Sequence, residues 1–168
     1  MRMKSIIFIL FGALLGCSKG NNMNVELNGP LTDCPSNSNC AYNYYDSADL
    51  TNETQLTAGK FRVFKYQSVN RNSCGATSQF YLKTSLSDNY FTIGPSQIAG
   101  GSIVAYDFTC PCCDLFVLAK PIGGEIKGRK TDAGRWLINA SIVFGPSANT
   151  PMDTLIVNQY FTSEKLPQ

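Results

Sequence analysis

In residues 135–144, RWLINASIVF, every second side chain is apolar, and the side chains between them include polar ones. Successive side chains of a β-strand point to opposite faces, so every second residue shares a face. One such set is apolar throughout: Trp136, Ile138, Ala140, Ile142 and Phe144. Asn139 and Ser141 fall on the opposite face, together with Leu137 and Val143. This period of two predicts a strand with one face in a hydrophobic core.

Similar segments occur along most of the chain. In DTLIVNQYF (153–161), Leu155, Val157 and Phe161 share one face. LFVLA (115–119) is apolar without alternation, which predicts a central strand covered on both sides. Seven further segments have strand character: 24–28, 41–46, 60–68, 77–84, 89–93, 102–109 and 123–129.

Turn signals such as LSDN, PIGG, TDAG and GPSANTP separate these segments. PSQIA (95–99) offers one helical turn at most. Many short strands at this spacing predict a single all-β domain over residues 24–168. We expect an antiparallel β-sandwich or a flattened β-barrel that contains disulfides, and the sequence does not distinguish the two closures.

The first 16 residues have a different character. Arg2 and Lys4 precede an apolar run, residues 5–16, in which Ser5 is the polar exception. The run is shorter than the ~20 apolar residues that a membrane-spanning helix needs, and it predicts a secretory signal peptide. Its end, Leu14-Leu15-Gly16-Cys17, resembles the lipobox of bacterial lipoproteins. In that family the thiol of the cysteine carries a diacylglycerol, a peptidase cuts before the cysteine, and the amine is then acylated, for example with palmitate.

The resemblance implies a lipid anchor on Cys17 after removal of residues 1–16. Residues 17–23 are polar and patternless, as expected of a flexible tether between the anchor and the domain. Ser18 stands where an Asp would favour retention on the inner membrane, so the resemblance favours the cell outer membrane. Two or more acyl chains would hold the protein firmly to the bilayer.

Net charge limits the partners. The chain has 14 basic and 12 acidic residues, and removal of residues 1–16 would take away Arg2 and Lys4 but no acidic residue. Twelve basic residues would then balance twelve acidic ones. Because nucleic-acid binding requires a basic footprint, we expect no nucleic-acid partner. Besides the membrane, the expected partner is an envelope protein or a glycan.

Six cysteines remain beyond the anchor: Cys34, Cys40, Cys74, Cys110, Cys112 and Cys113. An even number in an exported chain is typical of a disulfide framework. Cys34 and Cys40 close a short polar loop, whereas adjacent cysteines in a strand point apart, which disfavours a Cys112–Cys113 bond. That leaves Cys74 to pair with one of Cys110, Cys112 and Cys113, while the other two close a local ring. Among these alternatives we favour Cys74–Cys112 and Cys110–Cys113, beside Cys34–Cys40.

Two chemical alternatives for the cysteines are less favoured. The chain contains no His, and a cluster of thiolates alone would be oxidised in an exported protein unless protected. Cys110-x-x-Cys113 has the spacing of a redox motif, but a third cysteine lies inside it and no βαβ unit surrounds it. We expect neither a metal nor another cofactor.

Catalytic motifs are absent from the sequence. Without His, no Ser-His or Cys-His nucleophile pair can form. Asp107, Asp114 and Glu125 could supply the carboxylate pair of a glycosidase, although strand ends and turns explain such residues as well.

Three weaker hypotheses concern binding and modification. Tyr42, Tyr44 and Tyr45 could stack on a sugar or pack in the core. Four basic residues at one predicted hairpin could bind an anion or protect a solvated strand edge: Lys127, Arg129, Lys130 and Arg135. Ser47 and Thr154 lie in D-S-A and D-T-L, which resemble the O-glycosylation acceptors of Bacteroidota envelope proteins.

These features favour a non-catalytic envelope lipoprotein that acts as a binding or structural accessory module. The alternative is a small inhibitor or ligand-capturing protein that uses a stiffened loop, either Cys34–Cys40 or residues 145–152. A redox or metal protein acting through Cys110 and Cys113 is a third hypothesis.

Overall fold

The structure is a computed structural model that describes residues 27, 29–72, 74–113 and 119–167. Within these residues the order is β1 (Ser38–Thr51), β2 (Gln55–Ala58), β3 (Phe61–Asn70), β4 (Thr77–Ser85), β5 (Tyr90–Ile93), α1 (Pro95–Ala99), β6 (Val104–Thr109), β7 (Lys120–Lys130), β8 (Trp136–Gly145) and β9 (Asp153–Ser163). The strands form one sheet in the order β5-β7-β8-β9-β1-β3-β4-β6, with β2 beside β1.

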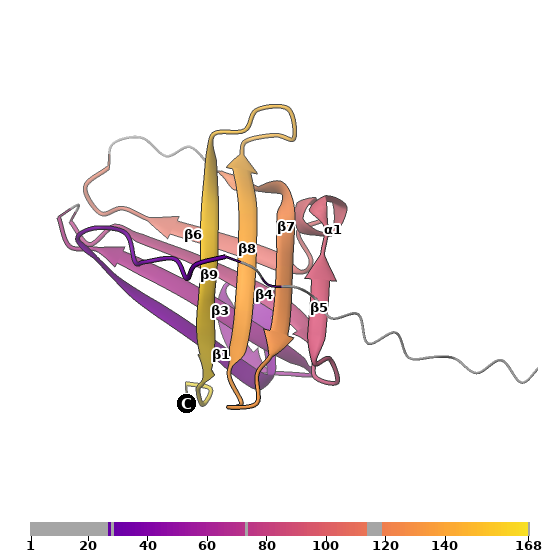
Figure 1. Ribbon diagram of the computed structural model, residues 1–168. Coiled ribbons are helices and arrows are strands. Elements are labelled where there is room, and N and C mark those ends of the chain that lie inside the picture. The colour runs from indigo at the N-terminus through magenta and orange to yellow at the C-terminus, as the bar shows by residue number, and fades with distance from the viewer. Residues whose placement is uncertain (1–26, 28, 73, 114–118, 168) are drawn as a thin grey trace, which may run out of the picture.

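This sheet folds over on itself into two layers. In Figure 1 the strands β5, β7, β8 and β9 form a front layer, and β1, β3, β4 and β6 cross behind it. The layers join where β1 and β9 pair in parallel, through Asn43 with Thr162 and Tyr44 with Ser163. β5 and β6 end the strand path without pairing to each other, so the sheet is not a closed barrel.

The all-β prediction is therefore confirmed, and the described residues adopt the sandwich-like arrangement. One detail differs from the expectation, because the pairing of β1 with β9 is parallel whereas the other strand pairs are antiparallel. A parallel pair of two residues forms here because β1 and β9 belong to different layers and meet only where those layers join. The alternation of apolar and polar residues within a strand shows which face is buried, but it does not show that β1 and β9 pair in parallel.

The core lies between the two layers, as the alternation in β8 predicts. Trp136, Ile138 and Ile142 are inaccessible to solvent, and Phe64 from β3 meets the Trp136 ring edge-on at 5.3 Å between centroids. Phe91 and Phe161 lie 5.6 and 5.8 Å from the same Phe64 ring. An aromatic cluster drawn from both layers thus fills the interior and contributes the large apolar burial on which the fold depends.

One charged side chain is buried beside this cluster. Arg62 in β3 is 4% exposed, and its Nε donates to Asp46 Oδ1 at 2.6 Å. Its Nη1 donates to the carbonyl oxygen of Asp88 at 3.2 Å. A buried charge is costly unless it is paired and hydrogen-bonded, and Arg62 meets both conditions.

Residues before β1 cover an edge of β9. Thr32 N donates to the Asn158 carbonyl at 2.9 Å, and Asn158 N donates to Thr32 Oγ1 at 2.9 Å. The Asn158 side chain donates further bonds to the carbonyls of Gly29 and Pro30. Beyond its short pairing with β1, this edge of β9 would otherwise present unpaired backbone groups, and the segment 29–32 satisfies part of them.

The predicted elements and the observed ones agree with a few differences. β1 extends well beyond the predicted 41–46, and the sequence did not predict β2. PSQIA forms the single turn of α1, and within the described part of the chain no helix has the length and apolar character needed to span a membrane. The predicted signal peptide (1–16), the tether (17–23) and Cys17 lie outside the described residues. So do most of the predicted strands 24–28 and 115–119, of which Leu27 and Ala119 are described and belong to no strand.

Candidate ligand-binding pocket

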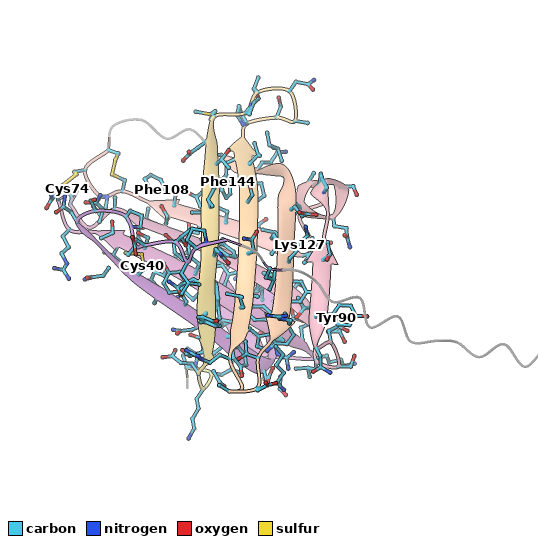
Figure 2. All side chains as sticks on the ribbon, viewed as in Figure 1. Cys40, Cys74, Tyr90, Phe108, Lys127 and Phe144 are labelled. Atoms are coloured by element: carbon cyan, nitrogen blue, oxygen red, sulfur yellow. A yellow bond between two sulfur atoms is a disulfide. The ribbon has the colours of Figure 1, made fainter. Side chains whose placement is uncertain are left out.

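Three disulfides stiffen one end of the back layer. The structure pairs Cys34 with Cys40, Cys74 with Cys112, and Cys110 with Cys113, which are the pairs that the sequence favours. In Figure 2, Cys40, Cys74 and Phe108 lie toward the same end of the molecule.

Strand register explains this clustering. Cys40 lies opposite Ser68, Ser68 opposite Ser78, and Ser78 opposite Phe108 across β1, β3, β4 and β6. Cys74 lies in the turn between β3 and β4, and Cys110 follows β6 directly. The start of β1, the end of β3, the start of β4 and the end of β6 therefore meet at one end of the layer.

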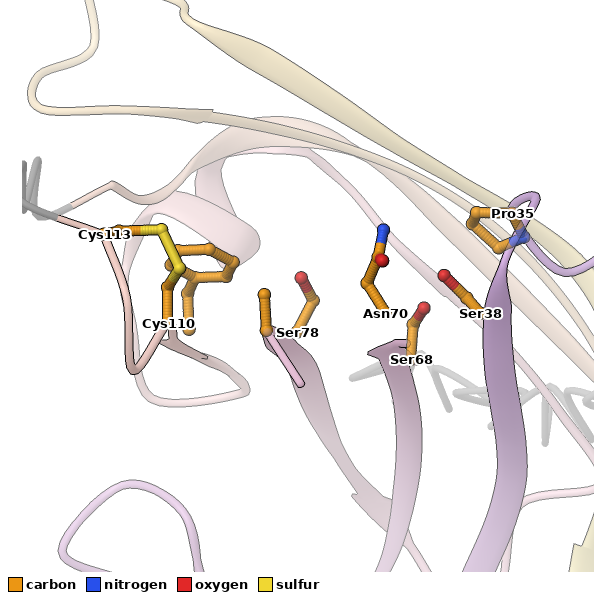
Figure 3. A pocket seen from close by; sticks show the side chains of 9 residues that line it. Pro35, Ser38, Ser68, Asn70, Ser78, Cys110 and Cys113 are labelled. Carbon is orange, nitrogen blue, oxygen red and sulfur yellow. A yellow bond between two sulfur atoms is a disulfide. The ribbon is translucent and has the colours of Figure 1, made fainter. Parts of the chain in front are cut away.

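A pocket of about 370 Å³ lies among these strand ends, and we call it the serine pocket. Its polar lining consists of Ser38, Ser68, Asn70 and Ser78, and its apolar lining of Pro35, Ala76, Phe108 and the Cys110–Cys113 disulfide. Figure 3 shows the serines projecting to one side from neighbouring strands, with the disulfide at one end of the row and Pro35 at the other.

The serine pocket continues the inner face of the back layer. Ser68 follows Tyr66 by two residues and Phe108 follows Tyr106 by two, so these pairs share a face. Tyr66 and Tyr106 pack in or against the core. The same alternation that buries aromatic rings between the layers thus presents hydroxyl groups where the pocket opens.

Two tyrosine hydroxyl groups are hydrogen-bonded to pocket serines, Tyr66 with Ser68 and Tyr106 with Ser78. Burial raises the pKa of Tyr66 and of Tyr106, and hydrogen bonds with Ser68 and Ser78, respectively, act in the opposite direction. Burial, with the nearby Tyr66 and Asp33, raises the pKa of Tyr42 to about 12. These hydroxyl groups therefore stay neutral at physiological pH, and the described residues that line the pocket carry no formal charge.

Comparison of this chain with known proteins does not assign it to a family. No family model, no curated protein and no solved structure matches this chain. The geometry of the described residues is therefore the basis for a functional proposal.

The tyrosines considered for sugar stacking or core packing, Tyr42, Tyr44 and Tyr45, are not among the residues that line the serine pocket. Tyr44 and Tyr45 are buried at 6% and 5% exposure, and the Tyr44 hydroxyl donates to the Gly134 carbonyl at 2.8 Å. Tyr42 is half-buried, and its ring lies 5.4 Å from Tyr66 and 5.6 Å from Phe161. Tyr44 and Tyr45 thus pack within the protein, which is the second of the two roles that the sequence offered, and Tyr42 packs against Tyr66 and Phe161 while remaining partly exposed.

The basic residues do not converge on a binding site either. Lys127 pairs with Glu125 at 2.7 Å on the outer face of β7. Arg129 is exposed farther along the same strand, whereas Arg135 lies 4.4 Å over the Tyr160 ring of β9. These basic side chains are spread over a solvent-exposed sheet face and do not surround a common point where an anion could bind.

The carboxylates proposed as an acid–base pair are separated. Asp107 and Glu125 alternate with core-facing neighbours in β6 and β7, so they point away from the core on opposite layers. Asp114 lies outside the described residues. Among the residues described, no group of three or more His, Cys, Asp or Glu side chains could hold a metal ion.

Ser47 and Thr154, the proposed glycosylation positions, are both exposed. Ser47 has a positive φ of 55° at the irregularity between β1 and β3, and the preceding Asp46 is engaged by Arg62. This ion pair provides a structural reason for Asp46 that is independent of glycosylation.

Sequence reasoning missed the serines and Phe108. Serines near strand ends usually indicate turns, so nothing in the linear order marks Ser38, Ser68 and Ser78 as neighbours. Two signals could have identified them. One is the register across the four back-layer strands, and the other is the even spacing that places each serine on the same face of its strand as a core aromatic residue.

Proposed function

We propose that this protein is a non-catalytic, lipid-anchored module of the bacterial cell envelope that binds its ligand or partner at the serine pocket. The observation that carries the proposal is the position of all three described disulfides around this pocket. Each one fixes a lining segment: Pro35 and Ser38 lie inside the Cys34–Cys40 loop, Ala76 follows Cys74, and Cys110–Cys113 is itself part of the wall. A site that is rigid before binding loses less entropy when the ligand arrives.

The anchor is supported by the lipobox resemblance at Leu14–Cys17 and by the charge-neutral mature chain. Cys17→Ala should block acylation and leave unprocessed precursor. Metabolic labelling with palmitate tests this: the unchanged protein should take up label and the variant should not. Label on the variant would indicate another anchor and would contradict the proposed localisation at the outer membrane.

Binding can be tested with envelope fractions of the source cells. The purified full-length protein should bind these fractions saturably, and Phe108→Ala should weaken binding at least tenfold. Phe61→Ala is the matched control, because Phe61 is similarly exposed (38% against 44%) and lies near the opposite end of the back layer, facing Ser85 rather than Ser78. Equal binding by both variants would remove the pocket from the proposal, and the lack of saturable binding would contradict the binding module.

A second candidate function, a small inhibitor, is favoured by the exposed loop between β8 and β9. Ser147 and Thr150 are hydrogen-bonded to each other across this loop, and Met152 at its end is 57% exposed. Figure 1 shows the loop protruding beyond the strands. Inhibition of a panel of secreted proteases, lost on Met152→Ala, would favour this function over the pocket.

A further inference from the structure

We infer that the serine pocket binds a short, neutral saccharide. The inference rests on the proposed function as a binding module and specifies the chemical class of the ligand. It follows from the charge, the polar groups, the exposed aromatic ring and the size of the pocket.

The charge of the lining selects against ions. None of the described lining residues is acidic or basic, so the pocket offers no counter-ion to a phosphate, a carboxylate or an amine. An ionic ligand would lose hydration on entry without gaining a partner of opposite charge. A neutral ligand does not incur this cost.

The polar groups match a ligand that carries hydroxyl groups. A serine hydroxyl both donates and accepts, and the Asn70 amide adds N–H donors, whereas its Oδ1 already accepts from Asn72 N at 2.9 Å. Ser38, Ser68 and Ser78 project to the same side from neighbouring strands, so they present a spaced row of such groups. The hydroxyl groups of a sugar ring also donate and accept, and they are arranged around the ring at fixed intervals.

Phe108 supplies the complementary apolar contact. Its ring lies in the pocket wall beside Ser78 and is 44% exposed, which is unusual for a phenylalanine on the face that continues the core. One face of a sugar ring carries mainly C–H groups with slight positive charge. The negative face of an aromatic ring attracts such groups while shielding them from water.

The size and rigidity of the pocket agree with a small ligand. A volume of about 370 Å³ lies near the lower end of the roughly 300–1,000 Å³ typical of small-molecule sites. The disulfides hold its walls, so the ligand meets a preformed surface. A long peptide would need a groove that extends past the strand ends.

The test uses the full-length protein in a zwitterionic detergent without a sugar headgroup, because a maltoside detergent could itself occupy the pocket. The labelled protein is applied to an array of neutral and acidic glycans, and each bound glycan is then titrated by calorimetry. We expect neutral glycans to bind and uronic-acid glycans of similar length to bind more weakly. Phe108→Ala should lower the affinity at least tenfold, Ser78→Ala should lower it severalfold, and Phe61→Ala should leave it unchanged.

Phe108→Leu is a second variant that keeps apolar volume but removes the ring face, and Trp136 fluorescence reports whether each variant is folded. Binding that survives in both folded Phe108 variants, exclusive binding of acidic glycans, or no glycan binding by the folded protein would each overturn the saccharide inference. If protease treatment of the envelope fraction abolishes its binding while glycans do not compete, the saccharide inference fails and the binding module stands. If neither the envelope fraction nor glycans bind, both fail.

Discussion

The guanidinium carbon of Arg62 lies 4.7 Å from the centroid of the Trp136 ring, over the only tryptophan of the chain. Arg62 reaches this ring from the opposite layer of the sandwich, so the contact joins β3 to β8. A desolvated cation over an indole face contributes about 2 kcal/mol or more, provided that its own hydrogen bonds are satisfied. Asp46 and the backbone carbonyls of Leu86 and Asp88 accept those bonds.

Asp46→Asn should therefore destabilise the protein more than its partly exposed position suggests. The change removes the only carboxylate paired with Arg62 among the described ion pairs, and leaves a buried guanidinium held by neutral acceptors. We expect a loss of about 1–3 kcal/mol in the free energy of unfolding. Urea unfolding followed by Trp136 fluorescence measures it directly.

Glu125→Gln is the matched control for this change. It breaks the pair with Lys127, in which both side chains remain substantially exposed to solvent. Surface pairs of this kind contribute about 0–1 kcal/mol. Similar losses for both variants would show that burial of Arg62 does not set the strength of its pair.

Gly128 provides a test of packing in the front layer. A Cβ at this position would overlap the Phe91 ring and come within 2.9 Å of Ile138 Cδ1. Gly128→Ala should thus force these buried groups apart and cost about 1–3 kcal/mol. Gly94→Ala, where a Cβ would meet nothing within 4 Å, should change the unfolding free energy by less than about 0.5 kcal/mol. A neutral Gly128→Ala would place Phe91 differently from the position described.

The three disulfides should contribute unequally to stability. Their cysteines are separated by 38, 6 and 3 residues for Cys74–Cys112, Cys34–Cys40 and Cys110–Cys113. The entropy that a cross-link removes from the unfolded chain grows with loop length, which predicts contributions of about 4, 2 and 1.5 kcal/mol. Paired Cys→Ser substitutions followed by urea unfolding test the ranking.

Thiol titration tests the same bonds in a different way. The folded domain should show no free thiol among these six cysteines, and reductant should release thiols only as Trp136 fluorescence reports unfolding. If Cys110 and Cys113 were reduced under mild conditions without any change at Trp136, the redox alternative would replace the structural one.

Alkaline pH should unfold the protein through its buried tyrosines. Burial, followed by nearby Tyr66 and Asp33 for Tyr42 and by Asp107 and Tyr45 for Tyr81, raises both pKa values from 10.0 to about 12. A group whose pKa is higher in the folded state stabilises that state fully below its unfolded pKa, and this contribution disappears as the pH rises through the folded pKa. The free energy of unfolding should therefore fall between about pH 10 and 12.

Between pH 6 and 8 the same measurement should be flat, because the chain has no His and the six described cysteines are bonded. Tyrosinate absorbance should rise over the same pH range in which the Trp136 fluorescence spectrum changes to that of the unfolded protein. Both are recorded within minutes to limit alkaline damage to disulfides. Tyr42→Phe should remove part of the alkaline transition. Ordinary tyrosine titration with the fold intact would contradict the burial of these hydroxyl groups.

Much of the fold could be predicted from local pattern, because alternation in β8 reports directly which residues face the core. Spacing predicted the Cys34–Cys40 pair, and the opposite directions of Cys112 and Cys113 disfavoured a bond between them. Which cysteine bonds Cys74 could not be derived, since it depends on where the β3–β4 turn meets the end of β6. The meeting of β1 with β9 could not be predicted, since it depends on how two layers close over Trp136 and Phe64. The serine pocket was hidden for the same reason: Ser38 and Phe108 are 70 positions apart in the chain and become neighbours only through the intervening register of β3 and β4.

The Cys74–Cys112 bond also makes a covalent ring that contains β4, β5, α1 and β6. A protease that cuts once in the exposed residues 85–87 or 100–102 opens this ring but releases no fragment, because each new chain end stays attached through a cysteine. A single cut in the exposed 132–135 turn has the opposite effect, since none of the described disulfides crosses it and the last two strands would be held only by non-covalent contacts, the strand pairing with β7 and β1 and the packing of the core. Retention after a single cut is therefore built into β4, β5, α1 and β6, which carry Ser78 and Phe108 of the pocket, whereas the β8–β9 hairpin keeps no described covalent link to the preceding chain once the 132–135 turn is cut.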